Sequence, residues 1–349
     1  MGTDSVLYQH PAGERVRPLA GSPRGAFVAT VKENRHLCTD HFRLILSLRG
    51  FPRNVPGQFV QLDCRDPHAG EQDKVAAQET RSFEWPADAT GERPKPCDVD
   101  FAAPVAYLRR PFSIADCRAW PDGYTEIDII HRVVGRGTTL LARLVEGDRL
   151  SLIGPLGVGF TVPAGLELAC LVGGGVGIPP LLYMAKMLAL KRCRYVVSFL
   201  GSQRGDLLPV ALTGPEPSRE GDPLFTVREL IEHQTPAVIT TDDGSVGMKG
   251  YVTQALRRFL GERQGALGPL KNAVVYCCGP TPMMKATGRV AAEFNVPCQV
   301  SLEQPMACGM GTCQSCIIKY RPHEAGETEW KYKLTCTEGP VFDTRDIVW

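Results

Sequence analysis

Four cysteines near the C-terminus constrain this chain more than any other feature of its sequence. Cys308, Cys313 and Cys316 follow C-x4-C-x2-C spacing, and nineteen residues separate Cys316 from Cys336. Plant-type ferredoxins use this arrangement to hold a two-iron, two-sulfur cluster. Iron and bridging sulfide prefer soft, anionic thiolate ligands. The spacing therefore predicts a 2Fe-2S cluster bound by these four side chains.

Zinc is the alternative occupant of these cysteines. A structural zinc site usually combines two C-x2-C pairs, and the second pair is missing here. Gly309 and Gly311 in the cysteine loop allow the backbone to approach sulfur atoms and direct N–H groups at them. The chain after Leu302 looks too short to form a hydrophobic core unaided, so we expect a bound cluster to stabilise it.

The composition argues against several functional classes. The chain has 349 residues, enough for two or three domains. Its formal net charge is +1 with no long run of one sign, so no nucleic-acid-binding surface is expected. No stretch has the roughly 20 consecutive apolar residues of a membrane span, and no apolar signal-peptide core occurs near the start. We therefore expect a cytoplasmic protein whose clustered cysteines are metal ligands and not disulfides.

Hydrophobic patterns predict a multidomain chain. Short β-rich runs punctuated by Gly, Pro and Asp occupy residues 25–163 and predict an antiparallel β-barrel. Apolar strands alternate with helices over residues 164–300, which predicts an α/β domain with a parallel sheet. Residues 301–349 form the small cluster domain. A flexible leader (1–24) and an insertion within the barrel domain (65–108) are assigned no chemistry.

The segment Arg110-Pro111-Phe112-Ser113 follows the insertion, where a barrel strand is expected to resume. A guanidinium at this place can bind a diphosphate with two hydrogen bonds. The alternative is an ordinary surface arginine beside an ordinary core phenylalanine. Downstream, the turn 135–138 ends a strand before an apolar helix and can present backbone amides to phosphate, unless it is a plain connection.

A glycine run over residues 173–177 lies between an apolar strand and a helix that begins with two prolines. It does not satisfy G-x-G-x-x-G, but the strand, loop and helix are arranged correctly for backbone approach to a pyrophosphate. Gly174, Gly175 and Gly177 are therefore predicted to bind a nucleotide. Tight packing at the crossover is the alternative.

Two further strand ends are predicted to join the same nucleotide site. Asp242 follows one strand, and Cys278, Gly279 and Pro280 follow another. The carboxyl ends of parallel strands form the ligand crevice of an open α/β sheet. The adjacent Cys277 and Cys278 invite a redox interpretation, but we interpret both as buried small side chains, with Cys278 a wall near the nicotinamide.

The order of these motifs resembles the ferredoxin–NADP reductase superfamily. The ending SLEQPMACGMGTCQSCIIK and KLTCTEGPVF is similar to the electron-transfer subunits of bacterial and archaeal type dihydroorotate dehydrogenases. The likeness covers roughly residues 25 to 349, apart from the insertion. It implies FAD and a 2Fe-2S cluster in a subunit that docks, in a heterotetramer, on a separate FMN-containing catalytic subunit of pyrimidine biosynthesis. Electrons would pass from FMN through the cluster and FAD to NAD.

The resemblance also implies roles for single residues, and it assigns no catalytic acid or base. The residues implied to contact the flavin and its diphosphate are Arg110, Pro111, Phe112, Ser113, Ile130, His131 and Arg132, with Gly137 and Thr138 at the pyrophosphate. The implied cluster ligands are Cys308, Cys313, Cys316 and Cys336.

Some positions depart from related families or leave a choice open. Plant-type reductases carry Tyr where Phe112 stands, and NADH-dependent ferredoxin:NADP oxidoreductase subunits carry Asp in place of Cys308. Reductase subunits of hydrogenases and sulfur reductases share the four cysteines and are the alternative family. Further alternatives are a self-contained reductase or oxygenase reductase that delivers electrons to a soluble acceptor, and a non-enzymatic iron–sulfur sensor. Arg204 after a predicted strand leaves NADP open beside NAD.

Overall fold

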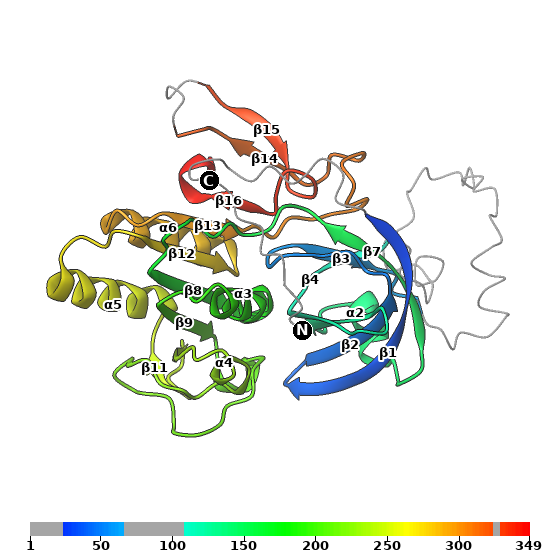
Figure 1. Ribbon diagram of the computed structural model, residues 1–349, viewed down its shortest axis with the longest axis horizontal. Coiled ribbons are helices and arrows are strands. Elements are labelled where there is room, and N and C mark those ends of the chain that lie inside the picture. The colour runs from blue at the N-terminus through cyan, green and yellow to red at the C-terminus, as the bar shows by residue number, and fades with distance from the viewer. Residues whose placement is uncertain (1–23, 66–107, 324–328) are drawn as a thin grey trace, which may run out of the picture.

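A computed structural model describes residues 24–65, 108–323 and 329–349. The predicted leader lies outside the described residues except for its last position, and so does nearly all of the predicted insertion. The described chain forms two sheets side by side, with a smaller two-stranded hairpin standing out from them (Figure 1). In the described part of the chain, no helix is both long and apolar enough to cross a membrane.

The N-terminal sheet has seven antiparallel strands in the order β4-β3-β7-β1-β2-β6-β5. Its alternating apolar side chains enclose one core, as expected for strands with one buried face. The short helix α2 (Arg136–Ala142) follows β6. The strands are β1 (Gly25–Cys38), β2 (His41–Arg49), β3 (Phe59–Leu62), β4 (Arg110–Ser113), β5 (Asp116–Ala119), β6 (Tyr124–Arg132) and β7 (Arg149–Leu156).

This sheet is a half-barrel, so the prediction of a barrel is only partly correct. The edge strands β4 and β5 do not pair with each other. They are consecutive in the chain, with only Ile114 and Ala115 between them, and the chain runs onward instead of reversing. Ile114 N donates to Gln58 O and Ala115 N donates to Asp128 O. The two edges of the sheet are therefore connected by the continuous chain at residues 114–115, and no hydrogen bonds between β4 and β5 close a barrel.

The second sheet has the order β11-β10-β9-β8-β12-β13-β16, and β8 to β13 run parallel as predicted. The strands are β8 (Leu168–Gly174), β9 (Tyr195–Ser202), β10 (Ala237–Thr241), β11 (Met248–Lys249), β12 (Ala273–Cys278), β13 (Cys298–Ser301) and β16 (Val341–Asp343). Two apolar cores cover its faces. One contains α5 (Val252–Leu267) and α6 (Thr281–Glu293), and the other contains α3 (Pro179–Leu190) and α4 (Arg228–Ile231).

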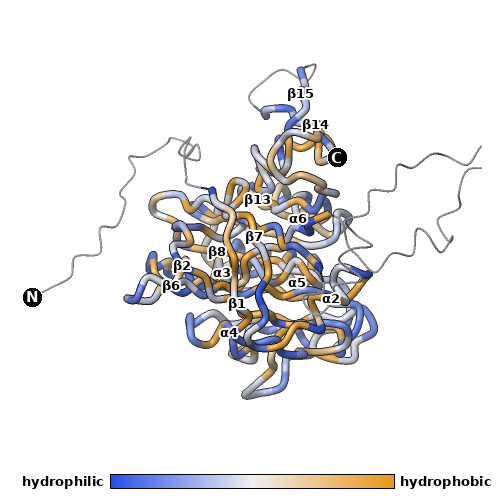
Figure 2. Tube along the Cα trace, turned by 90° about the vertical axis from the view of Figure 1, so that its right-hand side faces the viewer, coloured by the Kyte–Doolittle hydropathy of each residue, from blue (hydrophilic) through white to orange (hydrophobic). Residues whose placement is uncertain are grey.

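The C-terminal segment forms the hairpin β14 (Ile317–Tyr320) and β15 (Lys331–Leu334) before returning to the second sheet. Its last strand, β16, pairs antiparallel with β13. In Figure 2 apolar residues concentrate in the two-sheet body, whereas the hairpin projects beyond it. The C-terminal end of the Cys-rich segment is thus held by backbone hydrogen bonds between β16 and β13 of the second sheet.

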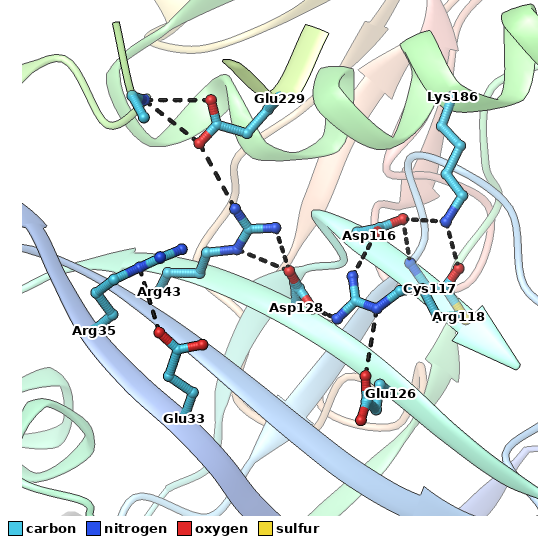
Figure 3. A network of polar contacts seen from close by, with 11 residues as sticks. Glu33, Arg35, Arg43, Asp116, Cys117, Arg118, Glu126, Asp128, Lys186 and Glu229 are labelled. Atoms are coloured by element: carbon cyan, nitrogen blue, oxygen red, sulfur yellow. Dashed lines mark hydrogen bonds and ion pairs between the residues drawn. The ribbon is translucent and has the colours of Figure 1, made fainter. Parts of the chain in front are cut away.

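A network of ion pairs joins the half-barrel to the helices of the second sheet (Figure 3). Asp128 on β6 has no exposed side-chain surface and accepts from the guanidinium groups of Arg43 and Arg118. Asp116 pairs with Arg118 and with Lys186 on α3, the latter at 2.6 Å. Because Arg43 also lies 3.6 Å from Glu229 on α4, the network holds the two sheets in one arrangement.

We expect Asp128→Asn to lower the free energy of unfolding by about 2–4 kcal/mol, because it leaves two partly buried arginines without their shared carboxylate. Urea denaturation followed by circular dichroism measures this loss. Glu126→Gln is the matched control, since this more exposed carboxylate lies 3.4 Å from Arg118 and should contribute under about 1 kcal/mol. Equal losses in both variants would contradict the assignment of Asp128 as the centre of the network.

Candidate functional site

The four predicted cluster ligands lie together as two pairs. Cys313 N donates to Cys308 Sγ at 3.4 Å, and Cys316 and Cys336 share one buried cluster. Burial, followed by the neighbouring Cys316 thiol, raises the pKa of Cys336 to about 12. Two pairs of sulfur ligands suit a two-iron cluster better than a single zinc ion.

The outer pair carries hydrogen-bond donors of the kind that stabilise thiolates. Met310 N also donates to Cys308 Sγ at 3.4 Å. The Ser315 hydroxyl lies 3.2 Å from Cys313 Sγ, and hydrogen bonds from Ser315 and Cys308 lower the pKa of Cys313 to about 6. Cys313 is exposed. Hydrogen bonds to cysteine sulfur are a regular feature of iron–sulfur sites, so the donors of this loop suit a cluster.

The two glycines of the loop adopt the backbone conformation that the sequence suggests. Gly309 has φ +68° and Gly311 has φ +91°, values that other residues adopt only with strain. They turn the chain tightly between the first and second cysteines. This is the close backbone approach that a cluster loop requires.

The inner pair packs directly on the half-barrel. Cys316 and Cys336 are each 1% exposed and share a small apolar cluster with Phe59 of β3 and Leu156 of β7. Nearby, the backbone of Val158 donates to Gly339 O at 2.5 Å. The cluster loop therefore lies on the outer face of β3 and β7, next to β4.

The strand β4 carries the predicted flavin motif, and its Phe112 belongs to an aromatic group. The Phe112 and His131 rings meet edge to face at 6.0 Å, and Phe42 stacks on His131 at 5.9 Å. His131 is 2% exposed, and neither of its ring nitrogens has a hydrogen-bond partner. Burial lowers the pKa of His131 to about 4. A neutral imidazole whose two ring nitrogens lack hydrogen-bond partners can bind a polar ligand.

Other flavin candidates are close to this group but differ in orientation. Arg132 also has a buried, unpartnered Nε. Arg110 is turned toward its own chain, where Nη1 donates to Leu108 O at 2.8 Å. Ile130 packs against α3 in the core of the second sheet, because neighbouring residues of a strand point to opposite faces. Its side chain therefore lies on the face opposite to His131.

The predicted pyrophosphate residues lie in the first turn of α2. This helix begins at Arg136, and Gly137 is buried behind its N-terminus. The Thr138 hydroxyl accepts from Val134 N at 2.9 Å and donates to Gly135 O at 2.9 Å. Thr138 thus stabilises the turn itself, and its role at a phosphate stays a prediction.

The glycine run divides into packed and open positions. A Cβ at Gly177 would overlap the backbone of Cys278 and Gly279, and one at Gly174 would lie 2.5 Å from Met283 Sδ. Gly175 has φ +53° and open space where a Cβ would be. The alternative of tight packing therefore describes Gly174 and Gly177, whereas Gly175 is open to a ligand.

The strand order places the predicted nucleotide crevice between β8 and β12. The chain moves from β8 outward to β9 and β10 and then returns to the other side of β8 as β12. Ligands bind outside the carboxyl ends of strands at such a reversal. Gly174 ends β8, and Gly279 and Pro280 follow β12. Because β6 contacts the turn 175–177, the predicted flavin residues His131 and Arg132 on this strand lie near the crevice.

The adjacent cysteines at the end of β12 are core thiols, as the sequence suggested. Cys277 is fully buried and Cys278 is 8% exposed. Burial raises the pKa of Cys278 to about 12. A thiol that stays protonated at neutral pH is a poor nucleophile, so a redox role has no support here.

Asp242 is exposed at the end of β10, two strands from β8. Strand spacing puts it about 10 Å from the crevice, so it would meet a distant part of a nucleotide. The end of β9 lies between them. There Arg204 donates to both carboxylate oxygens of Asp206 at 2.9 Å, and Asp206 also accepts from Thr39 Oγ1 at 3.0 Å. The guanidinium is thus already paired with a carboxylate.

A cavity of about 330 Å³ lies between the half-barrel, α3 and α4. Its walls include Arg43, Asp116 and Glu229, which belong to the ion-pair network. None of the predicted cofactor residues lines it. We therefore interpret this cavity as a gap in the contact between the sheets, separate from the cofactor site.

Sequence reasoning missed several residues that the fold brings to the site. Four such residues lie beside residues that the sequence analysis names, namely Phe42 beside His131, Ser315 beside Cys313, Asp206 beside Arg204 and Gln61 beside Gly309. Ser315 could have been found, because it lies between two cysteines of the motif. Phe42 and Gln61 belong to ordinary strand patterns and become apparent only when strands pair.

Family models match two parts of this chain. Residues 303–348 match the iron-sulfur cluster binding domain of dihydroorotate dehydrogenase B. Residues 171–289 match the oxidoreductase NAD-binding domain. These matches coincide with the paired cysteines and with the parallel sheet.

Full-length relatives agree with these domains. The dihydroorotate dehydrogenase B (NAD(+)), electron transfer subunit of Caldanaerobacter subterraneus subsp. tengcongensis is 34% identical over 320 residues, which cover 92% of this chain and 97% of the relative. The subunit of the same description from Desulforamulus reducens is 36% identical over 242 residues, covering 69% of this chain and 80% of the relative.

Solved structures share the architecture. The NADH-dependent reduced ferredoxin-NADP oxidoreductase structure, described for flavin-based electron bifurcation, superposes with a TM-score of 0.62 at 26% identity and covers 92% of this chain and 90% of that chain. The ferredoxin reductase in carbazole 1,9a-dioxygenase has a TM-score of 0.52 at 22% identity, covering 79% of this chain and 67% of that chain, and this second likeness concerns the fold alone.

We expect Cys316→Ser to lose most of its bound iron and acid-labile sulfide while it keeps flavin, because the buried thiolate is replaced by a poor iron ligand and the flavin strand is a separate segment. Chemical analysis and visible absorption measure both. Cys193→Ser is the control, since this half-buried thiol lies outside the loop and should not change the iron content. Full iron content in Cys316→Ser would contradict the ligand assignment.

Proposed function

Because this chain belongs to the family of dihydroorotate dehydrogenase B electron transfer subunits, we propose that it passes electrons from an FMN-containing catalytic subunit to NAD through a 2Fe-2S cluster and FAD. The observation that carries the proposal is the grouping of the four cysteines in two pairs, of which the inner pair, Cys316 and Cys336, packs directly on the half-barrel. The catalytic subunit oxidises dihydroorotate in pyrimidine biosynthesis, and this chain needs no acid or base of its own.

The proposed flavin residues bind and orient FAD without taking part in bond changes. Arg110 would turn from Leu108 O to the diphosphate, with Gly137 and Thr138 beside it. Pro111, Phe112 and Ser113 on β4, and Ile130 through its backbone, would line the flavin. His131 and Arg132 have the unpartnered nitrogens that a flavin could satisfy. A bound flavin exchanges two electrons with a nicotinamide as hydride and single electrons with a cluster.

The proposed nicotinamide site is the crevice beyond β8 and β12. Gly175 would let the backbone approach the nucleotide, since no protein atom occupies the space beside it. The crevice would be shaped by close packing between the two loops that contain Gly174, Gly177 and Gly279. Pro280 directly precedes α6, and the protonated Cys278 thiol would form an uncharged wall. Asp242 would meet the far end of the nucleotide.

The proposed entry point for electrons is the outer cysteine pair. Cys313 is exposed, and Met310 beside it is 50% exposed, whereas Cys316 and Cys336 are buried against the half-barrel. A catalytic subunit that docks here would place its FMN on the exposed side of the cluster. We propose that two copies of each subunit form a heterotetramer.

We also propose the domain limits of this chain. The half-barrel domain comprises residues 25–163, the nucleotide-binding domain residues 164–300 and the cluster domain residues 301–349.

A reducing compartment fits the proposal. All cysteines among the described residues are free, and cluster ligands must remain thiols until iron binds. We therefore assign the protein to the cytoplasm.

Reconstitution tests the proposed function. The chain, loaded with FAD, iron and sulfide, is mixed with the FMN-containing catalytic subunit of dihydroorotate dehydrogenase. We expect a stable complex by size-exclusion chromatography and reduction of NAD that depends on dihydroorotate and on both subunits. Absorption changes at 340 nm, on the order of one NADH per dihydroorotate oxidised, give the readout. If the loaded chain forms no complex and accepts electrons only with hydrogenase subunits, the proposal is wrong.

Nucleotide choice gives a second prediction. Asp206 neutralises Arg204 at the end of β9, the strand next to β8. A carboxylate at this strand end would favour the 2′-hydroxyl of NAD over the 2′-phosphate of NADP. We expect Asp206→Ala to raise kcat/KM for NADPH relative to NADH about tenfold. Asp222→Ala, which breaks an exposed pair with Arg258, is the control. An unchanged ratio in Asp206→Ala would show that Asp206 does not select the nucleotide.

A further inference from the structure

Gln61 is a buried polar side chain between the two proposed redox sites. It lies in the middle of β3 and is 1% exposed. Its neighbours Val60 and Leu62 point into the half-barrel core, so Gln61 points to the opposite face. Phe59 lies on that face and touches the inner cysteine pair. Gln61 is therefore on the side of the sheet that carries the cluster loop.

The amide end of Gln61 touches the cluster loop. A Cβ placed on Gly309 would lie 2.5 Å from Gln61 Nε2 and 2.7 Å from its Cδ. Gly309 directly follows the first cluster ligand, Cys308. Glycine is therefore favoured at this position for two reasons: a larger side chain would clash with Gln61, and the backbone has a positive φ.

The Nε2 atom of Gln61 is buried and has no hydrogen-bond partner. A buried donor without a partner destabilises the folded protein. The nearby Gln58 is different, since its Nε2 donates to Gly157 O at 2.9 Å and its Oε1 accepts from Val55 N at 3.0 Å. Both ends of the Gln58 amide thus form hydrogen bonds, whereas Nε2 of Gln61 at the cluster loop has no acceptor.

Gln61 is also directly opposite the flavin motif. In the β3–β4 pair it is in register with Pro111, and opposed residues of an antiparallel pair lie about 5 Å apart on one face. The side chain therefore lies between β3 and the cluster loop, beside the strand proposed to hold FAD.

We propose that Gln61 donates its amide hydrogens to sulfur of the 2Fe-2S cluster on the Cys308 side, and that this bond raises the reduction potential of the cluster. The inference rests on the proposed function. A donor to cluster sulfur stabilises the reduced state, which carries one more negative charge. Reduction is thereby favoured at the cluster that lies next to the flavin.

The test compares Gln61→Met, which keeps the length and removes the donor, with Gln61→Glu, which keeps the shape and adds a negative charge. Gln58→Met is the matched control. Iron, sulfide and FAD contents are measured first, and the cluster is then titrated with mediators and followed by electron paramagnetic resonance. We expect the ratio of reduced to oxidised cluster in Gln61→Met to fall about tenfold at a fixed solution potential, a shift of about 59 mV for one electron.

Gln61→Glu should lower the ratio further, and Gln58→Met should leave it unchanged. Reduction of FAD by NADH should keep its rate in all variants, because the Gln61 side chain faces Gly309 of the cluster loop and not the crevice proposed for the nicotinamide. An unchanged potential in both Gln61 variants with full iron content would overturn the inference. If Gln61→Met does not retain iron, Gln61→Glu decides the result. Absence of a cluster in the unsubstituted protein would instead refute the proposed function.

Discussion

The arrangement of the whole molecule depends on the alternation of side chains along β6. Ile129 points into the half-barrel core, and His131 points to the aromatic group beside the flavin motif. Asp128 and Ile130 point the other way, into the ion-pair network and the core of the second sheet. Because successive residues of a strand must face opposite sides, one strand both builds the flavin side and fastens the half-barrel to the nucleotide sheet.

The same half-barrel also receives the cluster segment on the outer face of β3 and β7. The inner cysteine pair is buried there, whereas the outer pair faces solvent. The segment is held at its other end by β16 on the parallel sheet. The flavin motif, the nucleotide crevice and the cluster loop are therefore fixed relative to one another by contacts of the same few strands. This suits a protein that positions cofactors for electron transfer and contributes no catalytic acid or base.

Much of the fold was predictable from local patterns. The glycine run connects β8 to α3, which begins with the two prolines as expected, and the alternation of strands and helices predicted the parallel sheet. The half-barrel was not predictable, because strand closure depends on which edges meet and β4 and β5 belong to one onward segment. Likewise, the pattern of Gly174, Gly175 and Gly177 does not reveal that only Gly175 is open.

The sequence alone determined the cofactor chemistry, because cysteine spacing and loop glycines are local properties that few metal centres share. It determined the order of the domains for the same reason, since hydrophobic periodicity is local. Only the tertiary structure decided which thiols are exposed, which strand the cluster loop covers, and that Gln61 faces Gly309 across 248 positions of the chain. Such contacts follow from strand register and from the packing of separate segments, and no stretch of sequence encodes them by itself.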